Sequence, residues 1–248
     1  MRIAFESLEP RLLLSADPLG AAEALADSTV LAYEAPLSAD ASSYTLRFNA
    51  GSGALELLDG DSLVASRALA ETSAVVIRGE DWLDDSLTVD FGFGGFFVLE
   101  DGIEFHGGAG GVDLLSVVGG EFAAVTHTAT ATGPGRSGSL VYDEGARLLA
   151  IGYTDLEPVD MTGSTITSLV FNLPGLDDQA ILEDDGTENN GVSQIRSRND
   201  APTFESTLFS DTVNNLQINL GGGAGVFAVG ALPDFVNKSL RIEGQAGA

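Results

Sequence analysis

Apolar and polar residues alternate in short runs along the chain from about Tyr44 onward. A two-residue period is typical of strands that bury one face, because successive side chains point to opposite sides of a sheet. The clearest runs span residues 44–48, 87–91 and 216–220. Glycine-rich segments follow them, and glycine tolerates the positive φ angles that tight turns need. The pattern predicts an all-β fold over residues 41–248.

One strand-like motif recurs, with a small polar residue, a leucine, a variable residue and an apolar residue. Its copies lie at residues 86–89, 139–142, 168–171, 215–218 and 239–242. The intervals are uneven, but degenerate recurrence on a scale of roughly 20–50 residues indicates stacked structural units. We therefore expect a right-handed parallel β-solenoid, with a β-sandwich of similar strands as the alternative.

Residues 1–40 differ from the rest of the chain. Pro10, Pro18 and Pro36 interrupt this region, and residues 21–26 consist of alanine, leucine and glutamate. These residues are good helix formers, so one short helix is expected within an otherwise flexible leader. The sequence thus divides into a leader, 1–40, and a β-rich region, 41–248.

The chain is strongly acidic, with 11 Lys and Arg residues, 37 Asp and Glu residues and a formal net charge of −26. Such a chain repels phosphate backbones, so nucleic-acid binding is not expected. Because 44% of the residues are apolar, the charge does not indicate a disordered tail. Excess carboxylate instead suits solubility or divalent cations.

Cysteine is absent, so disulfides and thiolate metal sites cannot form. No apolar run approaches the length of a membrane-spanning helix, about 20 residues. The three leucines at 12–14 are fewer than the about 7–15 apolar residues of a secretory signal, and Glu6 and Glu9 precede them. If the chain is exported, we expect a route without an ordinary cleaved signal peptide.

Residues 5–18 contain a Leu-Glu-Pro-Arg-x-Leu-Leu string. This string resembles the LEPR-XLL segment at the start of very large, repeat-rich surface and secreted proteins of Gram-negative bacteria. Residues 103–120, 152–159 and 216–244 are similar to the repeating units that follow such leaders. The resemblance implies an extracellular β-rich array with adhesive or matrix roles, frequent calcium-binding turns, and repeats that continue beyond the C-terminus.

The strongest local motif spans residues 105–117 and includes the glycines of 107–111 followed by Asp113. It resembles the Gly-Gly-x-Gly-x-Asp nonapeptide of calcium-binding parallel β-rolls, in which glycine turns present carbonyl oxygens and aspartate adds charge. The resemblance implies a calcium site at Asp113, Gly108 and Gly110. Gly111 is an extra residue in this pattern, so a plain turn aspartate is the competing interpretation. A second glycine-rich turn, 222–227, has no aspartate.

Other polar and aromatic side chains favour structural roles. Adjacent carboxylates are interpreted as solvated turn or edge residues that prevent edge-to-edge pairing; they lie at Asp84-Asp85, Asp177-Asp178 and 183–185. Glycine-spaced aromatics favour core packing over a sugar-stacking platform; they are Phe91, Phe93, Phe96 and Phe97, with Trp82 nearby. Of the two histidines, His106 and His127, the second lies between threonines, which favours a surface strand position over a catalytic base.

These observations favour a non-enzymatic structural or adhesive repeat module, extracellular or at the surface of a Gram-negative cell. Its expected partner is a cell-surface or matrix ligand, such as a polysaccharide, or another copy of the chain. The alternative is a secreted carbohydrate-active β-helix enzyme, in which carboxylates such as Asp177 and Asp184 act as acid and base. An enzyme should have a cleft with converging carboxylates and a basic residue, whereas an adhesive module should have smooth faces and open ends.

Overall fold

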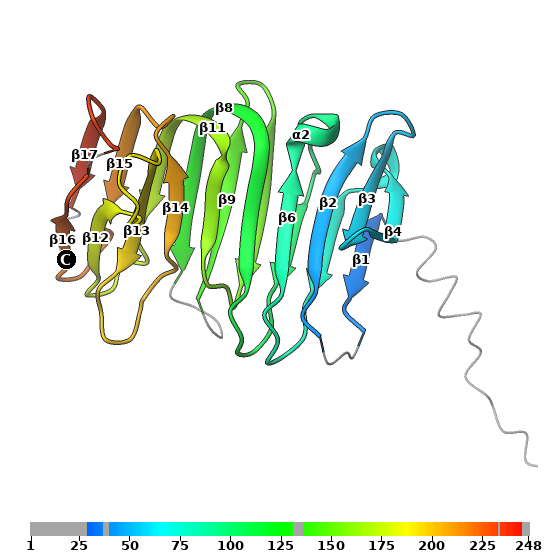
Figure 1. Cartoon of the computed structure of the whole chain (residues 1–248), viewed down its shortest axis with the longest axis horizontal. Coiled ribbons are helices and arrows are strands. Elements are labelled where there is room, and N and C mark those ends of the chain that lie inside the picture. The colour runs from blue at the N-terminus through cyan, green and yellow to red at the C-terminus, as the bar shows by residue number, and fades with distance from the viewer. Residues whose placement is uncertain (1–28, 37–39, 131–135, 233, 245–248) are drawn as a thin grey trace, which may run out of the picture.

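The computed structural model describes residues 29–36, 40–130, 136–232 and 234–244, and this part of the chain is nearly all β (Figure 1). Its helical structure is limited to a 3-10 turn, η1 (Leu69–Glu71), and one short helix, α2 (Phe91–Gly94). The all-β prediction is confirmed.

Most of the predicted leader lies outside the described residues. This includes the Leu-Glu-Pro-Arg string and the expected helix at 21–26. Within the range 1–40, however, Val30–Glu34 form strand β1, which pairs in parallel with β5 (Ala74–Arg78). Residues 30–34 therefore belong to the sheet, and the leader function of the preceding residues stays a prediction.

Four parallel strands form a first stack, in which each strand pairs with the next. They are β1, β5, β7 (Gly102–His106) and β10 (Leu148–Thr154). The register places Leu31 beside Val75, Val75 beside Ile103, and Ile103 beside Ile151. Because alternate residues of a strand share one face, these side chains form a continuous buried column.

A second stack contains six parallel strands. They are β2 (Ser43–Asn49), β6 (Ser86–Asp90), β8 (Leu114–Thr130), β11 (Val159–Asn172), β15 (Asn215–Asn219) and β17 (Ser239–Glu243). Copies of the recurring motif align here, with Leu169 beside Leu216 and Leu216 beside Leu240. The recurrence in the sequence therefore marks residues that occupy one column of the stack.

Antiparallel strands flank and join the two stacks. A hairpin of β3 and β4 extends β2, and β9 pairs with both β8 and β10. The motif copy at 139–142 lies in β9, so the motif is not confined to parallel strands. Strands β12, β13 and β14 form a meander, and β16 pairs in parallel with β12. The bounds are β3 (Ala54–Asp59), β4 (Ser62–Ala68), β9 (Ser137–Asp143), β12 (Gln179–Asp184), β13 (Val192–Ser197), β14 (Thr207–Ser210) and β16 (Val226–Val229).

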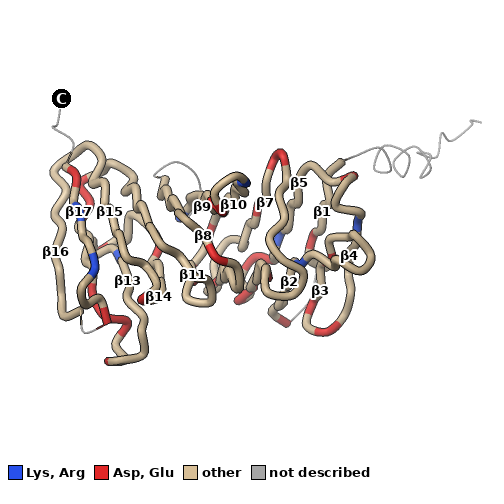
Figure 2. The backbone as a smooth tube through the Cα atoms, turned by 90° about the horizontal axis from the view of Figure 1, so that it is seen from above, with Lys and Arg blue, Asp and Glu red and all other residues tan. Residues whose placement is uncertain are grey.

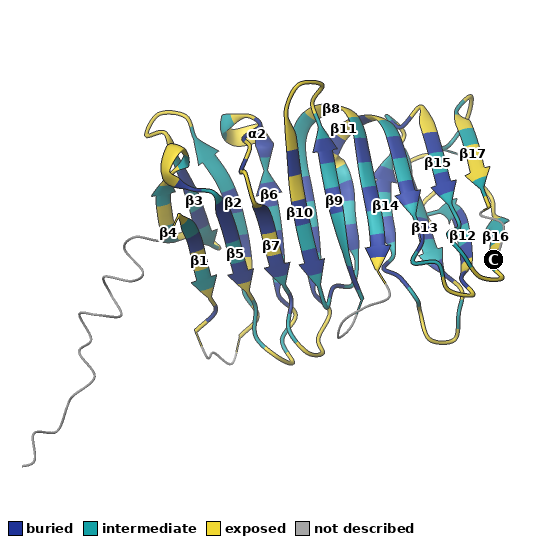
Figure 3. Cartoon of the chain, turned by 180° about the vertical axis from the view of Figure 1, so that it is seen from behind, coloured by how far each residue is buried: buried dark blue, intermediate teal, exposed yellow. Residues whose placement is uncertain are grey.

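The described strands form one 17-stranded mixed sheet that is mostly parallel and not closed. The second stack lies on one side of the molecule in Figure 1, and the first stack lies on the other side in Figure 3. One hydrophobic cluster contains buried residues of both stacks, and Figure 3 shows buried residues along the middle of the strands. Acidic residues are spread over the turns along the molecule (Figure 2).

Aromatic side chains fill the core next to α2. Phe91 and Phe122 meet edge to face, with ring centroids 5.7 Å apart, and Phe122 meets Tyr142 at 4.8 Å. Phe96 and Phe97 are also buried. The expected core role is thus confirmed for three of the clustered phenylalanines, whereas Phe93 is 53% exposed and Trp82 is 79% exposed.

Candidate functional site

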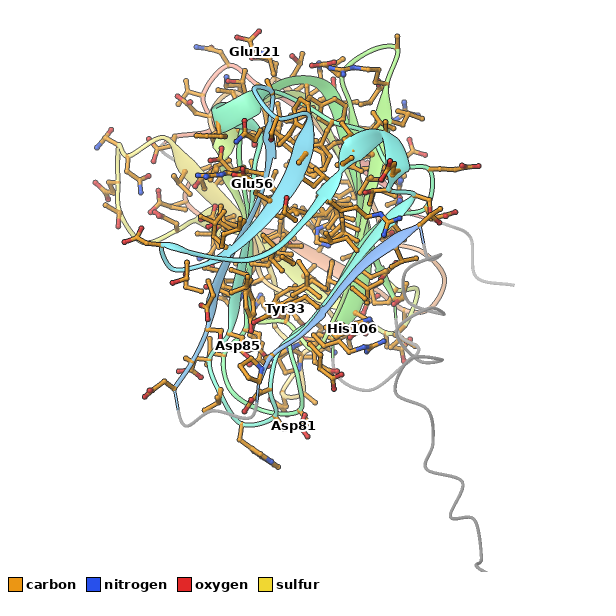
Figure 4. All side chains as sticks on the ribbon, turned by 90° about the vertical axis from the view of Figure 1, so that its right-hand side faces the viewer. Tyr33, Glu56, Asp81, Asp85, His106 and Glu121 are labelled. Atoms are coloured by element: carbon orange, nitrogen blue, oxygen red, sulfur yellow. The ribbon has the colours of Figure 1, made fainter. Side chains whose placement is uncertain are left out.

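The glycine-rich turn at 107–113 lies against the preceding turn, 79–85. The Trp82 N–H donates to the carbonyl oxygen of Ala109 at 3.0 Å. The Ala109 N–H in return donates to Oδ1 of Asp81 at 2.8 Å. Asp81 lies near the lower edge of the molecule in Figure 4. The two turns are therefore held together by backbone and carboxylate hydrogen bonds.

The extra residue Gly111 has a structural reason. It adopts a φ of 91°, and a Cβ at this position would overlap the carbonyl oxygen of Leu83 in the preceding turn. Its neighbour Val112 donates its N–H to Oδ1 of Asp84 at 2.8 Å. Only glycine combines this φ with so close a backbone approach. The departure from the nonapeptide pattern is thus what lets the two turns stack.

The second glycine-rich turn repeats the arrangement. The Ala224 N–H donates to Oδ1 of Asp177 at 2.8 Å. Gly223 has a φ of 93°, and a Cβ there would lie 2.5 Å from the carbonyl oxygen of Leu176. In both places a glycine turn packs on an earlier Leu-Asp-Asp tripeptide. The sequence interpretation missed this signal. The tripeptides are residues 83–85 and 176–178.

The second aspartate of each tripeptide is buried. Asp85 is 1% exposed and Asp178 is fully buried, so the expectation of solvated carboxylates is wrong for both. Asp85 accepts the N–H groups of Ser42 and Glu80, each at 2.7 Å. A carboxylate that satisfies two backbone donors stabilises the turn in which it is buried.

Asp113 occupies the position in its turn that Asp85 has in the preceding turn. It is 2% exposed, and its Oδ1 accepts the Asp85 N–H at 2.8 Å. Burial raises the pKa of Asp113 to about 7, and the nearby carboxylates of Asp85, Asp84 and Asp155 act in the same direction. Asp113 is therefore an acid that can exchange a proton near neutral pH.

The three residues predicted to bind calcium lie together. Asp113, Gly108 and Gly110 all line one cavity of about 350 Å³. Calcium takes about six to eight oxygen ligands, however. The described residues contain no group of three or more His, Cys, Asp or Glu side chains that could hold a metal ion. Asp81 and Asp84 already accept N–H groups of this turn. Calcium binding at Asp113 stays a prediction.

A second charged centre forms around Arg136, which precedes β9. Its Nε lies 2.7 Å from Oε1 of Glu205, and another guanidinium nitrogen pairs with Glu157. Glu205 is 3% exposed, and its Oε2 has no hydrogen-bond partner among the described residues. Burial raises the pKa of Glu205 to about 7, and the Arg136 charge opposes that rise. Of the two Glu205 carboxylate oxygens, Oε1 contacts Arg136 and Oε2 has no hydrogen-bond donor among the described residues.

Arg136, Glu157 and Pro202 line both the Asp113 cavity and a neighbouring cavity of about 600 Å³. We call these two adjoining cavities the Arg136 groove. Donors, acceptors and apolar side chains line the larger one. They are Arg136, Glu157, Pro158, Gln194, Arg196, Ser197, Pro202, Phe204, Glu205, Ser206 and Leu208.

Sequence interpretation did not single out Arg136, Glu157 or Glu205. They come from the segment before β9, the connection between β10 and β11, and the segment before β14, so no local spacing joins them. The carboxylates considered as an acid and base pair, Asp177 and Asp184, line neither cavity of the groove. The site is a product of the strand topology.

His127 is a core residue, which corrects the expectation of a surface position. It is fully buried in β8, where its Nε2 lies 2.6 Å from the Tyr153 hydroxyl and its Nδ1 lies 3.2 Å from Oγ1 of Thr207. Burial lowers its pKa to about 3, so the ring is neutral at physiological pH. Both ring nitrogens have partners, and His127 acts as a polar cross-link within the core.

Comparisons of the chain with protein families, with curated proteins and with solved structures found no match. Among the described residues, no helix has the length and apolar character needed to cross a membrane.

Proposed function

We propose that this chain is a non-enzymatic structural and adhesive module of an extracellular or cell-surface protein, built as a right-handed parallel β-solenoid. The observation that supports this proposal is in-register stacking. Leu169, Leu216 and Leu240 form one column of the second stack, and the glycine turns stack on Leu-Asp-Asp turns at two places. Repeated stacking of this kind gives an extended scaffold whose turns contact only their neighbours.

The last described strands expose apolar side chains that a binding partner could cover. Val226 and Val229 of β16 and Ile242 of β17 are exposed. The opposite end carries the β3–β4 hairpin next to β2. Apolar side chains on an open turn are what another turn of the chain, or a second copy, would cover.

The test of this proposal is the location of the protein. The full chain and a variant lacking residues 1–28 are produced with the same C-terminal tag in a Gram-negative host. Labelling intact cells with a membrane-impermeant reagent, together with analysis of the medium, measures export. The proposal predicts that the full chain is labelled or released at its unprocessed mass, and that the shortened chain is retained. Retention of both inside the cell would contradict an extracellular role.

A second candidate function has one observation in its favour. The Arg136 groove contains Asp113 and Glu205, two buried carboxyl groups whose pKa is raised to about 7, beside a guanidinium group. Carbohydrate-active enzymes use paired carboxyl groups as acid and base, with the acid's pKa raised by burial. New reducing ends released from a neutral polysaccharide, and lost in Glu205→Gln, would establish this function over the non-enzymatic one.

A further inference from the structure

The unpartnered oxygen of Glu205 is the starting point. Buried polar atoms in proteins nearly always have a hydrogen-bond partner, and leaving one without a partner is destabilising. Glu205 Oε2 is buried without a partner in the part of the chain that the structure describes, and Glu205 lines the larger cavity of the groove. A ligand hydroxyl in this cavity would supply the missing donor.

Arg136 provides the complementary donors. A guanidinium group carries five N–H donors in a fixed plane, more than its contacts with Glu205 and Glu157 use. The contact between Nε and Glu205 restrains the group from one side. Arg136 lines both cavities and Glu205 lines the larger one, so a donor and an acceptor lie side by side at the larger cavity.

The remaining lining restricts the chemistry of the ligand. Four carboxyl groups line the groove, against two guanidinium groups, so phosphorylated, sulfated or uronic-acid ligands are disfavoured. Gln194, Ser197 and Ser206 add neutral hydrogen-bonding groups, while Pro158, Pro202, Phe204 and Leu208 add apolar surface. Alternating hydroxyl groups and C–H faces on an uncharged sugar match such a mixed surface.

We propose that the Arg136 groove binds an uncharged oligosaccharide, with Glu205 Oε2 accepting from a sugar hydroxyl and Arg136 donating to a neighbouring ring or hydroxyl oxygen. The larger cavity, about 600 Å³, and the adjoining one, about 350 Å³, lie within the range of small-molecule sites. The inference rests on the proposed adhesive function, because it names the ligand class for that role.

The experiment is calorimetric titration of the full chain with neutral hexasaccharides of glucose, mannose and galactose, and with the matched galacturonic acid hexamer. We expect saturable binding of at least one neutral oligomer and at least tenfold weaker binding of the acidic one. Arg136→Gln and Glu205→Gln should each weaken the neutral ligand at least tenfold. Arg241→Gln, which changes an exposed guanidinium on β17, should leave the affinity unchanged.

Folding of each variant is checked by circular dichroism and thermal melting. If Arg136→Gln fails to fold, because it leaves a buried carboxylate unpaired, the double variant Arg136→Gln/Glu205→Gln removes both charges and takes its place. No binding of any neutral oligomer, or tighter binding of the acidic hexamer, would overturn the saccharide assignment. Neither result would affect the export experiment, so failure of the ligand class and failure of the adhesive module are distinguishable.

Discussion

The stacked glycine turns and the Arg136 groove both contain aspartate or glutamate side chains, but they use them differently. In the 79–85 turn, Asp81, Asp84 and Asp85 each accept backbone N–H groups of a neighbouring segment. Asp178 in the second turn and Glu205 in the groove each keep one buried oxygen without a partner among the described residues, but only Glu205 lines the groove. A saturated carboxylate stabilises the fold, whereas an unsaturated one beside a cavity remains free for a ligand.

Of the variants that test this difference, Gly111→Val should have the largest effect. The new side chain would overlap the Leu83 carbonyl oxygen at a positive φ, and we expect a loss of about 3–5 kcal/mol in the free energy of unfolding. Gly53→Val is the matched control, because Gly53 has a φ of 72° with no atom within 4 Å of an added Cβ. It should lose only about 1–2 kcal/mol. Equal losses in urea unfolding would show that stacking is not the reason for Gly111.

Replacement of the core histidine comes next in size. His127→Leu leaves the Tyr153 hydroxyl and Thr207 Oγ1 without their imidazole partner, and we expect a loss of about 1–3 kcal/mol. His106→Leu is the control, because His106 is only half-buried and bonds to Thr154. A smaller loss for His127→Leu than for His106→Leu would contradict the cross-linking role.

Loss of one turn carboxylate should have a moderate effect on stability, and the effect should be the same in both pairs of turns. Asp84→Ala and Asp177→Ala each remove an acceptor for an N–H group of the following turn, and each should lose about 1 kcal/mol. Asp61→Ala, in the β3–β4 turn, should stay within about 0.5 kcal/mol of the wild type. If only one of the paired variants loses stability, the two turns are not equivalent.

The groove carboxyl group predicts a smaller effect that depends on pH. The pKa of Glu205 is raised from 4.5 to about 7 on folding. The folded state therefore holds this proton more tightly, so the stability contribution of Glu205 falls as the pH rises through that window. Glu205→Gln cannot ionise and lacks this loss. As the pH rises between these values, the stability of Glu205→Gln relative to the wild type should increase. Melting curves at each pH measure this difference. His127, whose pKa is lowered, titrates identically in both proteins and cancels from the difference. A constant difference would contradict a buried, raised Glu205.

Calcium should have the smallest effect. Because Asp81 and Asp84 already accept N–H groups of this turn, we expect calcium to bind weakly. At a calcium concentration equal to its dissociation constant, a single site adds about 0.4 kcal/mol. The melting temperature would then rise by about 1–2 °C. Asp113→Asn should abolish this rise. A rise of many degrees that persists in Asp113→Asn would place a strong calcium site elsewhere.

The sequence predicted those parts of the molecule that depend on local patterns. Alternation identified the strand character of β2, β6 and β15, and recurrence anticipated the alignment of Leu169, Leu216 and Leu240. Spacing also placed Gly108, Gly110 and Asp113 in one turn, and they line one cavity. In each case the relevant residues are close in sequence or repeat a short motif.

The remaining features depend on contacts between distant segments. Asp85 and Asp178 are buried, and the Asp85 carboxylate bonds to Ser42, 43 positions away, which a doublet of aspartates does not reveal. Arg136 and Glu205 are 69 positions apart. They meet because the connection between β10 and β11 bonds to both segments, with the Leu156 N–H donating to the Arg136 carbonyl and the Val159 N–H to the Ser206 carbonyl. Their pairing, and the unpartnered oxygen that it leaves, could be found only in three dimensions.

The most direct test of this account compares Asp84→Ala with Arg136→Gln/Glu205→Gln in one calorimetric titration with the neutral hexasaccharide that binds the wild type. The account predicts that Asp84→Ala loses stability but keeps the wild-type affinity. The double variant should fold and lose binding at least tenfold. Two results would contradict the separation between carboxylates that stabilise the turns and carboxylates that bind a ligand. One is unchanged affinity in the double variant, and the other is loss of binding in Asp84→Ala while it remains folded.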